Sequence, residues 1–129
     1  MNIVDVHDHA VDDIRTLRAI NIRAAAAVLV VLEQIGADPR AIDKLTTHGE
    51  NLFGTTRLNV KRWQAAKGIG NLWRFRILDT PATTWRIVYG YHWQTRRICV
   101  LAVVEKEEFD YDDLASTLSQ RIAEDWRTL

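Results

Sequence analysis

Three strand-like segments follow one another between residues 72 and 105, and this run most constrains the fold of the chain. In residues 72–77 and again in 85–91, apolar side chains alternate with arginine and other residues. Residues 97–105 are instead almost continuously apolar. A period of two predicts a strand with two different faces, and an unbroken apolar run predicts a strand buried on both. We therefore expect a three-stranded antiparallel meander over 72–105, with its last strand central to the core.

The flanking sequence predicts mostly helices. Apolar residues recur at helical spacing over residues 8–35, which predicts a helical hairpin, and the pair Asp-Pro predicts a brief helix over 39–47. Residues 3–6 alternate and favour one short strand, whereas residues 49–71 read as a long basic connection. A stripe at steps of four predicts a final helix over 113–128. The expected class is α+β, with the N-terminal strand and helical hairpin packed on a small antiparallel sheet.

Size and composition favour one domain over residues 1–129. With 47% hydrophobic residues the chain can bury a single sizeable core, but two domains would each be marginal. The longest apolar run, residues 24–32, is well below the ~20 residues that span a bilayer. No basic segment followed by an apolar one opens the chain, so we expect a cytoplasmic protein with no membrane contact. The one cysteine, Cys99, is expected to be a buried, inert thiol.

The formal net charge of zero hides a strongly basic segment. Residues 57–106 contain ten Lys and Arg against two acids, whereas residues 1–56 carry a net charge of −3 and residues 107–129 of −5. Cations clustered on one element among Trp and Tyr are typical of a surface that binds a polyanion, above all RNA or DNA. Within this segment, residues 57–67 favour equally an RNA-docking arm and a short amphipathic element that covers the sheet.

Several segments resemble the RelE/ParE superfamily of bacterial toxins from type II toxin-antitoxin pairs. They are VHDHAVDDIRTL as strand into helix, the arginine-bearing strand NLWRFRI, the next strand WRIVYGY, and RRICVLAVVEKEEFDYDD as the last strand with its charged tail. The resemblance covers most of the chain and implies a RelE-like fold. It also implies a cognate antitoxin protein as partner. The expected assembly is a homodimer of the chain or a toxin-antitoxin hetero-oligomer.

The RelE branch of this family consists of ribonucleases, and cleavage by a ribose 2′-hydroxyl needs no metal or other cofactor. It needs a base, cations that stabilise the extra charge on phosphorus, and an acid for the leaving oxygen. Forked guanidinium donors suit the middle task. The resemblance implies a catalytic set that consists of Arg74, Arg76, Arg86, Lys106 and Tyr111. The RNA-binding candidates around it are Lys61, Arg62, Lys67, His92 and Arg96.

Each of these residues also has an ordinary structural interpretation. Arginines opposite a buried strand face are common solubility residues, and an aromatic residue before a helix often packs against it. The acidic tail after the last strand departs from strongly catalytic relatives, which tend to be doubly basic there. If the chain is a ribonuclease, Glu105 or Glu107 is a candidate general base.

Three functions remain open from the sequence. The first is an endoribonuclease, an mRNA interferase that cuts mRNA on the ribosome. The second is a ParE-like inhibitor of DNA gyrase without catalysis, and the third is an inactive interaction module on the same fold.

The remaining candidates are histidines and tryptophans. His7 and His9 are expected to share a strand face as exposed histidines, and no metal site is expected because no third ligand is evident. Trp63 and Trp93 have polar and basic neighbours and are the two tryptophans expected to meet a nucleobase.

Overall fold

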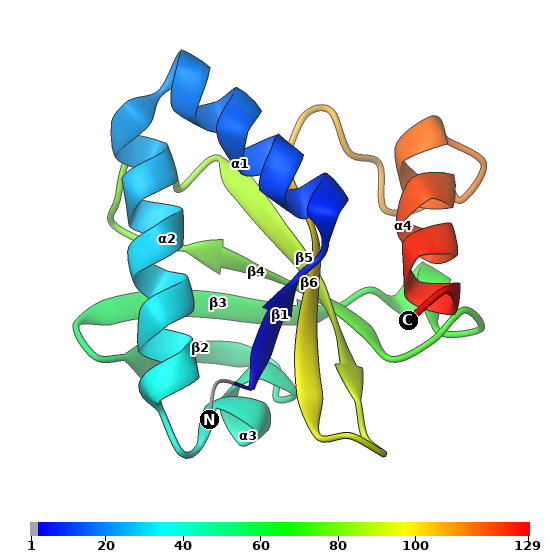
Figure 1. Cartoon of the computed structure of the whole chain (residues 1–129), viewed down its shortest axis with the longest axis horizontal. Coiled ribbons are helices and arrows are strands. Elements are labelled where there is room, and N and C mark those ends of the chain that lie inside the picture. Colours follow the sequence, from blue (N-terminus) through cyan, green and yellow to red (C-terminus); the bar gives the residue numbers. More distant parts are fainter. Residues whose placement is uncertain (1–2) are drawn as a thin grey trace.

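The computed structural model describes residues 3–129, and these form six strands, four α-helices and one short 3-10 helix (Figure 1). In chain order they are β1 (Val4–Val6), α1 (Asp8–Ile20), α2 (Ile22–Ala37), α3 (Ala41–Leu45), β2 (Gly49–Phe53), β3 (Thr56–Arg62), η1 (Gln64–Ala66), β4 (Leu72–Ile77), β5 (Trp85–His92), β6 (Arg97–Glu105) and α4 (Thr117–Arg127).

All six strands belong to one mixed sheet in the order β1-β6-β5-β4-β3-β2. β1 runs parallel to β6, and the other neighbours are antiparallel. The α+β class is confirmed. The expected small antiparallel sheet was wrong in two respects, because the sheet contains a parallel pair and has six strands where four were expected.

The extra strands come from the segment that was interpreted as a connection. Residues 49–62 form the hairpin β2–β3, which turns at Gly54 with a positive φ of 60°. In β3 the buried residues Leu58 and Val60 alternate with polar ones, but the many cations of this segment hid that period. Most of the segment therefore belongs to the sheet and is not a connection, and RNA docking by residues 57–67 stays a prediction.

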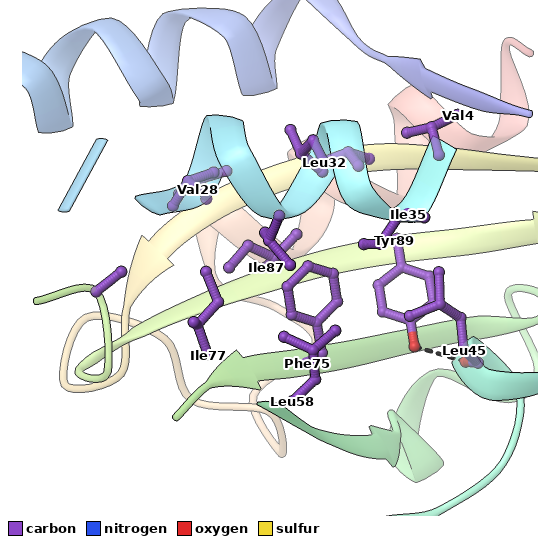
Figure 2. Packing of buried hydrophobic residues seen from close by; sticks show 14 of the residues in the cluster. Val4, Val28, Leu32, Ile35, Leu45, Leu58, Phe75, Ile77, Ile87 and Tyr89 are labelled. Atoms are coloured by element: carbon purple, nitrogen blue, oxygen red, sulfur yellow. Dashed lines mark hydrogen bonds between the residues drawn. The ribbon is translucent and has the colours of Figure 1, made fainter. Parts of the chain in front are cut away.

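Helices α1 and α2 cover one face of the sheet, here called the helical face (Figure 1). Val28, Leu32 and Ile35 of α2 pack over Phe75 and Tyr89, among other side chains of the central strands (Figure 2). The Tyr89 hydroxyl is buried and donates a hydrogen bond of 2.6 Å to the Leu45 carbonyl of α3. The alternation expected in β4 and β5 is confirmed by this packing.

The opposite face of the sheet, here called the arginine face, holds a second apolar cluster. Ile122 and Trp126 of α4 pack there against residues of the central strands. A β-bulge at Leu101 shifts the β5–β6 register, since Val88 pairs with Ala102 but Tyr89 with Val100. Leu101 and Ala102 consequently both join this cluster, and β6 is buried along both faces as expected.

Two glycines make room for α4. A Cβ atom added to Gly90 in β5 would lie 2.6 Å from Cε3 and 2.8 Å from Cη2 of Trp126. A Cβ atom on Gly70 would lie 2.9 Å from Cδ1 of the same ring. Since carbon atoms normally stay about 3.5–4.0 Å apart, the indole of Trp126 sits directly on the backbone of both glycines.

Helix boundaries follow their caps. The expected hairpin over 8–35 is two helices divided at Asn21, whose side chain accepts a hydrogen bond from the Ala24 amide. The final helix was expected from residue 113 but begins at Thr117, because Ser116 is its N-cap. The Asp113 carboxylate instead accepts from the Ala115 amide in a local turn. No helix within residues 3–129 is long and apolar enough to cross a membrane.

Candidate functional site

Three arginines lie together on the arginine face. Arg74 and Arg76 are separated by one residue in β4, so both point away from the helical face, and Arg86 does so from β5. The β4–β5 register pairs Arg74 with Val88. Continued by two residues, it brings Arg76 opposite Arg86. The structure thus places these three predicted residues on one surface.

No described acid neutralises this group. Within residues 3–129, no ion pair involves Arg74, Arg76 or Arg86. By contrast Arg57, on the same face of β3, pairs with Asp79 and with Glu50. Cations held close together without a counter-charge raise the free energy of the protein, and an anion that binds between them lowers it.

Tyr111 closes one side of the arginine group. The segment after β6 folds back over the sheet, where Trp63 donates a hydrogen bond of 2.7 Å from its Nε1 to the Tyr111 carbonyl. The ring of Tyr111 stands edge-on to Phe109, and the Arg74 guanidinium carbon lies 5.8 Å from the centre of the Tyr111 ring. Such a contact is a cation–π interaction. It orders Tyr111 next to the predicted arginines.

Two buried polar atoms at this surface have no partner among the described residues. They are the Tyr111 hydroxyl oxygen and the Arg76 Nε. Buried donors in folded proteins are nearly always hydrogen-bonded, so both atoms are candidates to bind a ligand or a water molecule. Both atoms can donate a hydrogen bond to an anionic oxygen.

Burial also changes the protonation behaviour of the group. It lowers the pKa of the Arg74 guanidinium, and repulsion from Arg76 acts in the same direction. It likewise lowers the pKa of Arg86, assisted by repulsion from Arg74. Burial raises the pKa of Tyr111 to about 12, partly offset by Arg74 and Arg86. At neutral pH Tyr111 is therefore a hydrogen-bond donor and not a base.

Arg86 differs from the other two arginines because the fold also uses it. Its side chain is 8% exposed. Its Nη1 donates hydrogen bonds to the carbonyls of Thr83 at 3.0 Å and Trp85 at 3.2 Å. These bonds fix the turn before β5, so Arg86 holds the strand start as well as adding charge to the surface.

A pocket of about 210 Å³ opens beside Arg74 and Tyr111. Its wall is completed by β3 and by the residues that follow it, and its lining comprises Lys61, Arg62, Trp63, Gln64, Ala65, Arg74, Tyr111 and Asp112. Lys61 is paired with Arg74 across β3 and β4 and is exposed. Its side chain therefore extends the basic surface toward the pocket.

Arg62 lies at the border of this surface. Its register partner is Trp73, which packs on the helical face, and its guanidinium carbon is 5.7 Å from the centre of the Trp73 ring. The guanidinium therefore turns away from Arg74.

Three of the other predicted residues lie farther off, and Lys106 lies at the end of β6. His92 ends β5 six residues beyond Arg86, about 20 Å along a strand. The centre of its ring lies 4.9 Å from that of Trp126, and the two rings are tilted. Arg96 is exposed in the following turn, and Lys67 is exposed after η1. Lys106 is exposed just after β6, where its amide donates a hydrogen bond to the Thr84 carbonyl. Continued by one residue, the β5–β6 register sets Lys106 opposite Thr84, on the side of the sheet to which Arg86 points. The structure does not gather His92, Arg96 and Lys67 with the arginines.

The carboxylates proposed as a general base are not in the group. Glu105 pairs directly with Trp85 across β5 and β6, and Trp85 packs on the helical face. Directly paired residues point to the same side of a sheet, so Glu105 faces away from the arginines. Glu107 is exposed in the turn that follows.

The two tryptophans expected to meet a base behave differently. Trp63 is 2% exposed and packs edge-on against Phe109, so its assignment to nucleobase contact was wrong. The polar neighbours of Trp63 in the sequence predicted an exposed ring. The ring is instead buried, and its indole donates a hydrogen bond to the Tyr111 carbonyl, which is distant in the sequence. Trp93 is 71% exposed in the β5–β6 turn and remains a prediction. Cys99 is buried as expected, and burial raises its pKa to about 11.

The arrangement can bind an anion and stabilise negative charge that develops on it, because charged and neutral donors converge from β4, β5 and the tail. No carboxylate among the described residues pairs with the three arginines, and the carboxylate that lines the neighbouring pocket is that of Asp112. Comparisons of the chain with models of protein families, with curated proteins and with solved structures found no match.

Proposed function

We propose that the chain is a RelE-like toxin, a cytoplasmic endoribonuclease that cuts mRNA on the ribosome without a metal cofactor. One observation carries the proposal: Arg74, Arg76 and Arg86 lie on one sheet face without any described acid as partner. An RNA phosphodiester is the anion that such a surface fits, and forked guanidinium donors bind its oxygens in pairs.

In this mechanism the ribose 2′-hydroxyl loses its proton to water and its oxygen attacks the adjacent phosphorus. The bond from phosphorus to the 5′-oxygen breaks and this oxygen takes a proton from water, which yields a 2′,3′-cyclic phosphate and a 5′-hydroxyl. Arg74 and Arg76 stabilise the additional negative charge on the phosphate oxygens. Tyr111, protonated at neutral pH, donates a hydrogen bond to the phosphate or to the leaving oxygen. Lys61 binds a neighbouring phosphate.

The antitoxin partner follows from the same surface. An acidic segment of a second protein that covers the arginine face would neutralise Arg74 and Arg76 and exclude RNA. We therefore expect the complex with the antitoxin to bind RNA more weakly than the free chain does, and its affinity to depend less on the salt concentration.

The test is expression of the chain without an antitoxin, followed by primer extension on cellular mRNA. Codon-linked breaks are expected in the wild type. The Arg76→Ala variant should lose roughly 10²–10³-fold of the cleavage rate, the usual cost of one donor to a developing charge. Arg57→Ala is the matched control, because Arg57 lies on the same face but is already paired with Asp79. Equal cutting by Arg76→Ala and wild type would contradict the assignment.

A ParE-like gyrase inhibitor is the second candidate, favoured because Glu105, a predicted general base, faces away from the arginine group. It predicts intact transcripts together with DNA damage in the same cells. Unimpaired growth on expression would refute both toxin functions and leave an inactive interaction module.

A further inference from the structure

A second group of polar side chains lies far from the arginines, where α4 meets the start of α1. His7 is the N-cap of α1, and His9 lies in its first turn. Asp125 of α4 approaches both, with its Oδ2 atom 2.7 Å from Nδ1 of His9 and 3.5 Å from Nδ1 of His7. The expected strand at His7 and His9 was wrong, since the helix begins at Asp8, and the third ligand comes from 116 residues away.

We propose that His7, His9 and Asp125 bind a divalent transition-metal ion of the Zn²⁺ class. One ring nitrogen of each histidine and one carboxylate oxygen of Asp125 all lie within 4.8 Å of one another. Ligands about 2.0–2.1 Å from a tetrahedral Zn²⁺ are about 3.3 Å apart. The three donors are thus within about 1.5 Å of that separation, which small side-chain rotations of His9 can supply because half of its side chain is exposed.

The charge around the group favours a cation. Asp125 is 5% exposed, so its carboxylate is largely withdrawn from water. The nearest cation is Arg121, whose Nε lies 3.9 Å from Asp125 Oδ2. Arg121 is chiefly engaged by Asp13, through hydrogen bonds of 3.1 Å and 2.8 Å. One arginine between two carboxylates leaves a charge of −1, and the two imidazoles add neutral donors.

The donor set also selects the metal. Two imidazole nitrogens and one carboxylate oxygen suit Zn²⁺, Co²⁺ or Ni²⁺, whereas Mg²⁺ and Ca²⁺ prefer all-oxygen sites. Three protein ligands leave at least one position for water. His9 lies at the surface, so that position is open to solvent. A bound ion would join the start of α1 to the end of α4, which are otherwise linked here by the His9–Asp125 hydrogen bond.

The site is tested by calorimetric titration of the full chain, free of any histidine tag, with Zn²⁺. One ion per chain is expected. His9→Asn should weaken binding more than about tenfold, because even residues that only orient a ligand contribute 10–100-fold. Asparagine retains a side-chain donor for Asp125, so the packing of α4 is kept. His48→Asn is the matched control, since the His48 ring packs at a tilt against Trp73 on the helical face, away from α4.

A measurement on the unaltered chain guards against a variant that fails to fold. On addition of Zn²⁺, the ring signals of His7 and His9 in the NMR spectrum should shift, while those of His48 and His92 stay in place. Equal affinity of His9→Asn and wild type, uptake of several weakly bound ions, or equal shifts at all four histidines would each overturn the proposal. Absence of any binding at about 100 μM Zn²⁺ would overturn it as well.

Discussion

The contact of Trp126 with Gly90 gives a sharp prediction about how α4 is held on the sheet. Gly90 lies in the middle of β5 and its φ is not in the left-handed region, so alanine fits the backbone. Alanine in a strand is normally favoured over glycine by roughly 0.5–1 kcal/mol. In the Gly90→Ala variant, however, the new methyl group would lie 2.6–2.8 Å from two carbon atoms of the Trp126 ring.

Relief of this overlap requires the indole to move by about 1 Å, given a normal carbon separation of 3.5–4.0 Å. Overpacking of this kind costs about 1–3 kcal/mol, which exceeds the gain from the strand preference. We expect a net loss of about 1–2 kcal/mol in the free energy of unfolding, measured by urea denaturation. Gly68→Ala is the matched control, because a Cβ atom there meets nothing within 4 Å.

A double variant separates the clash from other causes. Trp126→Leu removes the ring, so adding Gly90→Ala to it should cost nothing or stabilise the protein slightly. The two substitutions are then strongly non-additive, as expected for residues in contact. A Gly90→Ala variant as stable as the wild type, or purely additive energies in the double variant, would refute the packing of α4 described above.

The remaining predictions concern Tyr111 and Asp13. Tyr111→Phe should raise the free energy of unfolding by about 1 kcal/mol at neutral pH, because it removes a buried hydroxyl without a partner among the described residues. A less stable variant would contradict this expectation. The same substitution should slow RNA cleavage. Because the pKa of Tyr111 is raised to about 12, folding favours its protonated form, and this contribution is full below about pH 10 and is lost as the pH rises toward 12. The stability advantage of Tyr111→Phe should therefore grow over that range in urea titrations, and a constant difference would argue against burial of the phenol. Asp13→Asn should lose about 2 kcal/mol, because the Asp13 carboxylate accepts from Arg121 and from the Val103 amide; chemical denaturation checks this, and an unchanged midpoint would show that the pair adds no net stability.

Alternation in the sequence was a reliable guide wherever the two faces differ in polarity. It correctly predicted that Arg74 and Arg76 point away from the helical face and that β6 is buried on both faces. It failed in β3, because the charges of Arg57 and Lys61 mask the alternation of the buried residues Leu58 and Val60. The local pattern thus predicted the strands that are rich in apolar residues and missed the strand that is rich in charged ones.

Contacts between distant segments were beyond the sequence. Nothing local shows that Trp63 hydrogen-bonds to the Tyr111 carbonyl, or that Asp125 meets His7 and His9, because such pairs form only after the helices are placed. The direction of Glu105 also depended on the bulge at Leu101, which reverses the side on which later residues of β6 point. Candidate residues could be chosen from their type, but their grouping required the fold.

The position of β6 has a consequence for synthesis of the chain. This strand lies between β1 and β5 in the sheet, although it is made after both. A nascent chain that ends before residue 97 has β1 without its partner and α1 without the strand on which it packs. It also lacks Tyr111. The growing polypeptide therefore cannot complete either face until its last quarter leaves the ribosome, and fragments that terminate earlier expose apolar surface instead of a finished basic site.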